Sequence, residues 1–179
     1  MLHKQAQLLA SLCVAGLMGC SASGGGESAN ILDAAAIYEA NSETFAFIRE
    51  TYPGPFTGFG RVPARRPSDQ TREDKIFFQE VRKAFAVEFI DFFPLGDTGR
   101  DEIAVVLKRY GLETNWTVIS LVYSGIPLPQ PEDGLKIAVF DKCDQRALDW
   151  FEMDHGDTTK SISAFCRINE YWYAHQIVH

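Results

Sequence analysis

The sequence lacks the short motifs that identify enzymes and cofactor sites. It contains no G-x-S-x-G, S-x-x-K or H-E-x-x-H pattern, no phosphate-binding glycine loop and no paired C-x-x-C. Such patterns hold a nucleophile, a metal ion or a phosphate in a fixed geometry, so their absence removes the direct reasons to expect catalysis. We expect no cofactor, and the sequence favours a binding or accessory protein without excluding an enzyme.

Basic residues are also scarce. The 179 residues carry 17 Lys and Arg against 24 Asp and Glu, a formal charge of −7. Binding to nucleic acid depends on neutralising backbone phosphates with Lys and Arg, so this balance argues against it. There is no internal repeat, and the length suits a single domain.

Long apolar runs are absent except near the N-terminus, where eleven residues, 8–18, follow Lys4 and precede Gly19. A hydrocarbon core of about 30 Å needs roughly 20 residues, so this run is too short to span a membrane. A basic start, a short apolar run and a small residue are typical of a cleaved export signal, which we place at residues 1–19.

The end of this signal, Leu17-Met18-Gly19-Cys20, resembles the lipobox of bacterial lipoproteins. The resemblance implies that the signal is removed and that Cys20 carries fatty acids such as palmitate. Met18 departs from the usual Ala, Ser or Thr of the motif. Ser21 stands where many lipoproteins of the inner membrane have aspartate, so the resemblance implies an anchor in the outer membrane with the protein facing the periplasm. The alternative is an ordinary secreted protein.

The segment 20–29 is rich in Ser and Gly, the composition of a tether between an anchor and a folded body. Residues 30–179 then form one domain, and the mature chain has a formal charge of −8. Once the signal has left and Cys20 is acylated, Cys143 and Cys166 remain. Two thiols in an oxidising compartment predict a disulfide, with two unlinked buried thiols as the alternative.

Hydrophobic periodicity predicts an α+β fold, with about three N-terminal helices packed on a four- to five-stranded antiparallel sheet. We expect the first helix at residues 30–52, the second from Thr71 until Pro94, and the third at residues 98–111. Loops are expected at residues 52–70 and 124–134. Alternation of apolar and polar residues predicts strands at residues 116–123, 135–141, 148–153, 161–168 and 171–178.

The disulfide conflicts with a simple up-and-down order of these strands. Cys143 and Cys166 would lie two strand spacings apart, about 9.5 Å, whereas a bridge needs Cα atoms within roughly 7 Å. Either the chain at Cys143 bends across a strand, or the segment 148–153 is not a central strand. One further phrase resembles a motif of small bacterial envelope lipoproteins in which a capped helix leads into an antiparallel sheet: Phe93-Pro94-Leu95-Gly96, with Thr98, Ile103, Leu107 and Gly111.

The first candidate binding surface is the segment 52–70, which is rich in proline, glycine and arginine and shows no regular periodicity. Long irregular loops in compact domains are usually functional or disordered. Arginine beside aromatic residues is the composition of protein-binding hot spots and of anion sites. The alternative is a solvated connection whose arginines pair with nearby acids. The candidate residues are Arg61, Arg65, Arg66, Tyr52, Phe56 and Phe59.

The second candidate is an acidic turn around His155, where an imidazole among carboxylates could bind a divalent cation or act as a base. Asp154 and Asp157 flank it, and Asp149 and Glu152 precede it. The alternative is a solvated turn shaped by Asp and Gly.

Three hypotheses follow from these features. The leading one is a non-enzymatic envelope lipoprotein that binds a partner protein or an anionic envelope component through residues 61–66. The second is a periplasmic hydrolase or metal-dependent enzyme that uses Asp154, His155 and Asp157. The third is an inhibitor or immunity-type protein. His175 and His179 are not expected to share a metal ion, because four residues on a strand span about 13 Å.

Overall fold

The computed structural model describes residues 29–51, 60–93, 102–112, 115–126, 128, 136–153 and 161–179. The predicted signal, the lipobox and all of the tether except Ala29 lie outside these residues. None of the described helices is long and apolar enough to cross a membrane.

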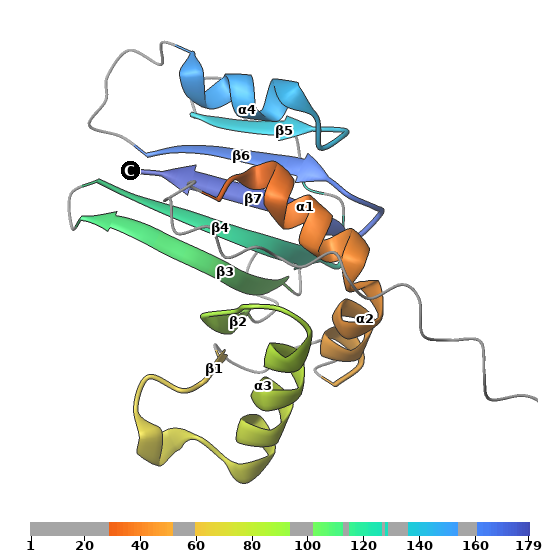
Figure 1. Cartoon of the computed structure of the whole chain (residues 1–179), viewed down its shortest axis with the longest axis vertical. Helices are drawn as coiled ribbons and strands as arrows, with labels where there is room; N and C mark the ends of the chain where they lie inside the picture. The colour runs from red at the N-terminus through yellow and green to blue at the C-terminus, as the bar shows by residue number, and fades with distance from the viewer. Residues whose placement is uncertain are drawn as a thin grey trace, which may run out of the picture.

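A seven-stranded sheet in the order β1-β2-β3-β4-β7-β6-β5 forms the centre of the described structure (Figure 1). Neighbouring strands are antiparallel, except that β5 and β6 run parallel. The two short strands β1 and β5 are therefore the edges of the sheet. The strands are β1 (Gly60–Val62), β2 (Phe89–Phe93), β3 (Glu102–Leu112), β4 (Asn115–Ser124), β5 (Ile137–Phe140), β6 (Ile162–Arg167) and β7 (Trp172–Val178).

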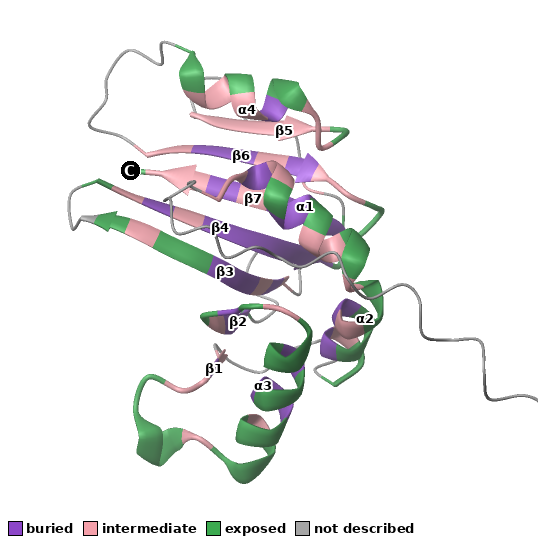
Figure 2. Ribbon diagram, in the orientation of Figure 1, coloured by how far each residue is buried: buried purple, intermediate pink, exposed green. Residues whose placement is uncertain are grey.

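The helices pack on one face of this sheet and share a single hydrophobic core with it (Figures 1 and 2). Alternate strand residues such as Leu121, Ala164 and Ala174 point to this covered face, and Ile31, Phe45 and Val81 of the helices pack against it. The helices are α1 (Ile31–Ala40), α2 (Ser42–Thr51), α3 (Arg72–Ala84) and α4 (Gln145–Glu152), with the 3₁₀ turn η1 (Pro67–Asp69).

The predicted fold class is therefore wrong in its arrangement. The described sheet has seven strands and is mixed, and the helices are distributed along the chain rather than gathered in its N-terminal half. Local signals were read correctly at two helix starts. Asn30 and Thr71 each form a capping box with the acid three residues later. The first predicted helix is divided at Asn41, which ends α1 and whose side chain donates to the Ile37 carbonyl over 2.8 Å.

The second and third predicted helices were extended through residues that form strands. α3 ends at Ala84, and β2 follows at Phe89–Phe93. The segment predicted as the third helix forms strand β3, in which Ile103, Val105 and Leu107 face the core. A bulge between Val106 and Lys108 shifts the alternation by one residue. It gives the strand a three-and-four spacing that resembles a helical period.

Gly111, predicted to end a helix, instead lies near the end of β3, where it pairs with Trp116 of β4. Its φ is +107°, and an added Cβ would lie 2.1 Å from the Asn115 carbonyl oxygen. Only glycine adopts this conformation at low cost. The end of β3 beside Asn115 and Trp116 therefore requires glycine at this position.

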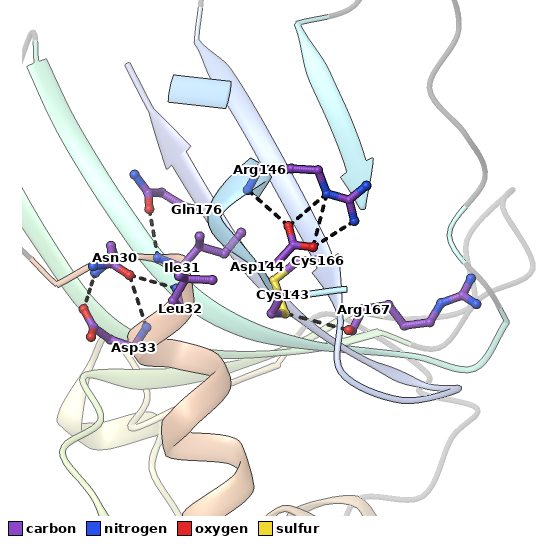
Figure 3. The surroundings of a disulfide bond; sticks show 10 residues. All are labelled: Asn30, Ile31, Leu32, Asp33, Cys143, Asp144, Arg146, Cys166, Arg167 and Gln176. Carbon is purple, nitrogen blue, oxygen red and sulfur yellow. Dashed lines mark hydrogen bonds and ion pairs between the residues drawn. A yellow bond between two sulfur atoms is a disulfide. The ribbon is translucent and has the colours of Figure 1, made fainter. Parts of the chain in front are cut away.

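The segment 148–153 was predicted as a strand, but all of it except the C-cap residue Met153 lies in α4, which has Asp144 as its N-cap. With that segment out of the sheet, β5 lies directly beside β6, and Phe140 pairs with Cys166. The Cα atoms of Cys143 and Cys166 are then 4.9 Å apart, and the structure contains the expected disulfide (Figure 3). The bridge therefore forms because the segment 148–153 is not a central strand, and not because the chain at Cys143 bends across a strand.

Candidate functional site

The most basic part of the molecule is the segment 60–84, which we call the basic lobe. It comprises β1, η1 and α3 and lies at the β1 edge of the sheet (Figure 1). The lobe has seven basic and four acidic residues, a net +3, whereas the rest of the chain has ten basic and twenty acidic residues, a net −10. Most of its residues are exposed (Figure 2). Charge is therefore segregated along the chain.

Arg61, the first candidate of the sequence analysis, is a structural residue. It lies in β1 directly opposite Asp91 of β2. Its Nε and Nη2 atoms bind the two carboxylate oxygens of Asp91 at 2.5 and 2.6 Å. The guanidinium also lies 3.8 Å from the ring centre of Phe89. This bidentate pair holds the edge strand to the sheet, so Arg61 is not offered to a partner.

Arg65 and Arg66 differ from Arg61 in both burial and contacts. They follow the cis peptide Val62-Pro63 and precede η1, and both are exposed. Among the described residues, neither forms an ion pair with a carboxylate. Their role in binding stays a prediction, and the segment around them contains β1 and η1 rather than being irregular throughout.

The outer face of α3 continues this basic surface. Phe77, Phe78 and Val81 are buried against the core. The opposite side of α3, an arc of about 120° around the helix axis, carries no acidic residue. Its residues are all exposed: Arg72, Lys75, Ile76, Gln79, Arg82 and Lys83.

Two of the cations on this face have contacts within the helix. Lys83 pairs with Glu80 at 2.7 Å, but both side chains are largely exposed and such a pair is weak. Arg82 lies 6.0 Å from the ring centre of Phe78. The pattern of the sequence could have revealed this face, because Arg72, Lys75, Gln79 and Arg82 recur at steps of three and four without an acidic residue among them.

Within the described residues, none of the other predicted candidates lies on this surface. Tyr52, Phe56 and Phe59 lie outside the described residues, as do Asp154, His155 and Asp157. Asp149 and Glu152 lie on α4, where Asp149 accepts a hydrogen bond from Gln145. Within the described part of the chain, no three His, Cys, Asp or Glu residues are grouped as metal ligands would be.

A polar cluster that the sequence analysis missed lies around His175, on the opposite face of the sheet from the core. Its Nδ1 is 3.0 Å from Ser120 Oγ, and its Nε2 is 2.9 Å from Ser163 Oγ. The ring also stacks on Phe165, with ring centres 4.1 Å apart. Burial lowers the pKa of His175 to about 4, so the imidazole is neutral at pH 7.

A neutral imidazole beside a serine hydroxyl is the pair used to activate a nucleophile. Here Ser120 and Ser163 are only 2% and 6% exposed, which leaves no access for a substrate to either oxygen. The two hydroxyls instead satisfy both ring nitrogens. His179 has different partners, since it stacks on Trp116 and contacts Ser161. We interpret the His175 cluster as structural.

Comparison with known proteins adds no relative: no family model, no curated protein and no solved structure matches the chain. The basic lobe is therefore assessed on its own geometry.

Proposed function

We propose that the chain is a non-enzymatic envelope lipoprotein, anchored in the outer membrane through Cys20 and facing the periplasm. In this proposal the basic lobe binds an anionic envelope component or the acidic surface of a partner protein. The binding residues are Arg65, Arg66 and the cations of α3, with Arg61 in a structural role. The single observation that carries the proposal is the +3 lobe on a chain whose remainder has a formal charge of −10.

Charge segregation of this kind affects association more than folding. A cationic surface attracts anionic partners before contact, and the acidic remainder of the protein repels them, so the approach is oriented. Arg65, Arg66, Arg72 and Lys75 are exposed, and each lacks a carboxylate partner among the described residues. Little intramolecular attraction must therefore be broken when they bind phosphates or carboxylates.

The anchoring part of the proposal is supported by the lipobox and by the way the folded body begins. The Ala29 carbonyl accepts a hydrogen bond from Tyr110 Oη at 3.0 Å. The Ile31 amide donates to Gln176 Oε1 at 3.0 Å (Figure 3). The chain is thus fixed to the sheet from the first described residues, at the end of the segment with the composition of a tether.

The proposed cleavage of the signal and the acylation of Cys20 are tested by mass spectrometry of the native protein. We expect residues 1–19 to be absent and Cys20 to carry acyl chains, and we expect the protein in the outer-membrane fraction. A Cys20→Ala variant, which offers no thiol for acylation, is the matched control. An intact Met1 or a free Cys20 thiol in the wild-type protein would remove the anchor and its location from the proposal.

The binding surface is tested by chemical cross-linking in intact cells. The variant changes Arg65, Arg66 and Arg72 to Gln, and we expect it to lose the cross-linked species that the wild type forms. A control variant removes the same number of exposed cations elsewhere, at Lys108, Arg109 and Lys142, and should retain them. Retention of every species by the first variant would rule out the lobe as the binding surface.

A further inference from the structure

We propose that the outer face of α3 docks on the anionic lipid surface of the membrane that holds the chain's own N-terminus. This inference rests on the proposed function, because it takes the acyl anchor at Cys20 as its starting point. It goes further by naming the ligand chemistry, the phosphates of lipid headgroups, and the residues that meet it.

The composition of the face matches an interfacial helix. Arg72, Lys75 and Arg82 supply the charge, and the Ile76 side chain among them is 50% exposed. A basic face with an isolated apolar residue is attracted by anionic headgroups and can insert that residue at the acyl boundary. Gln79, at the centre of the face, is uncharged and exposed. None of the six residues of the face is acidic, and the nearby Glu80 carboxylate is paired with Lys83.

The same composition is less suited to a shaped protein interface. Stable protein interfaces bury about 800 Å² per partner around a core depleted of charge. The α3 face has one apolar residue and four cations, and its neighbours Arg65 and Arg66 add two more. Such a surface fits an extended plane of negative charge better than a pocket or an apolar patch on another protein.

The length of the chain ahead of the domain allows this contact. Ten residues, 21–30, lie between the acylated cysteine and α1, and a chain of ten residues reaches at most about 35 Å. That is about twice the radius of gyration of roughly 15 Å expected for a domain of this size. An intramolecular contact through a short connection has an effective concentration in the millimolar range. Even a weak lipid contact would then be populated.

A single fluorescent label tests the contact in the full, processed lipoprotein. With Cys20 acylated and Cys143 bound to Cys166, a Gln79→Cys variant has one free thiol. An Asp149→Cys variant on α4 is the matched control, because α4 lies by β5 at the other edge of the sheet (Figure 1). Both proteins are reconstituted into phosphatidylcholine vesicles with and without phosphatidylglycerol, with spin-labelled lipid as the quencher.

We expect the label at position 79 to be quenched on vesicles that contain phosphatidylglycerol and much less on phosphatidylcholine alone. The label at position 149 should be unquenched on both. Changing Arg72, Lys75 and Arg82 together to Gln should lower the ratio of docked to free protein on the order of 100-fold. The Lys108, Arg109 and Lys142 control should leave that ratio unchanged, and Ile76→Ser should lower it roughly tenfold.

Equal quenching at positions 79 and 149, or no quenching at position 79, would overturn the docking. If the Arg65, Arg66 and Arg72 variant still loses a cross-linked acidic protein in that case, the proposed function stands and its ligand is a protein. If mass spectrometry finds Cys20 unmodified, the anchor itself is wrong and the proposed function fails first. The three outcomes are distinguishable.

Discussion

Replacing Arg61 should destabilise the fold far more than replacing Arg65, although the two arginines are four residues apart in the same segment. Arg61 binds both oxygens of Asp91, whose side chain is 9% exposed, and its own side chain is 21% exposed. An Arg61→Ala variant leaves the Asp91 carboxylate nearly buried without its partner. Arg65→Ala removes a solvated side chain.

The magnitude follows from the burial of the pair. Breaking a fully buried ion pair by removing one partner costs about 3–5 kcal/mol. Arg61 retains some contact with water, which screens the remaining charge, so we expect a loss of about 2–3 kcal/mol. That corresponds to a fall in Tm of roughly 5–10 °C for a domain of this size. Exposed substitutions such as Arg65→Ala usually change stability by less than about 0.5 kcal/mol.

Urea denaturation followed by circular dichroism measures both variants. A double variant, Arg61→Met with Asp91→Leu, separates the charge from the packing, because it removes both charges and keeps apolar volume beside Phe89. We expect it to recover most of the lost stability. If Arg61→Ala and Arg65→Ala have the same midpoint, the ion pair does not hold β1 to the sheet, and the assignment of Arg61 to a structural role is refuted.

Three further outcomes are expected. Replacing Cys143 and Cys166 together with Ala should cost about 3 kcal/mol, because the bridge closes a loop with a sequence separation of 23; an unchanged Tm would contradict this. His175 has a pKa of about 4 in the fold against about 6.5 when unfolded. The unfolded chain therefore takes up the proton first, and stability should fall by at most about 3 kcal/mol as the pH drops from 6.5 to 4. A His175→Gln variant should lose that part of the pH dependence, and NMR titration of the ring gives the pKa directly; a ring that titrates near 6.5 would refute the assignment. Gly111→Ala should destabilise the protein by about 2 kcal/mol or more, because its Cβ would lie 2.1 Å from the Asn115 oxygen. Gly60→Ala, whose Cβ would meet only Phe92 at 3.7 Å, is the matched control and should be nearly neutral in the same denaturation experiment.

Local chemistry in this sequence predicted local structure well. The capping boxes at Asn30 and Thr71 are formed, and strict alternation identified β4, β6 and β7. In each case the signal depends on residues a few positions apart. Such signals survive folding when no long-range contact opposes them.

The errors arose where distant residues decide the structure. The bulge at Leu107 is a feature of the pairing between β3 and β4, and a single segment cannot reveal that pairing. Phe89 continues the spacing of α3, but it pairs with Val106 in the sheet and its segment becomes a strand. Tertiary pairing of this kind overrides local periodicity.

The candidate site shows the same division. Exposed arginines in an acidic chain could be recognised from composition, and Arg65 and Arg66 lie on the surface as expected. The partner of Arg61 is thirty residues away in sequence, and the partners of His175 come from β4 and β6. Their roles depend on strand order, which the sequence alone did not reveal.

The attachment of Ala29 and Ile31 to the interior of the sheet determines how the body would respond to a mechanical load. A pull on the preceding chain is transmitted through Tyr110 and Gln176 to β3 and β7, which are inner strands and not edges. Several ladders of backbone hydrogen bonds must then share the strain. A weak start to α1 would let the first helix peel away alone, whereas this arrangement spreads the stress across the domain before any element detaches.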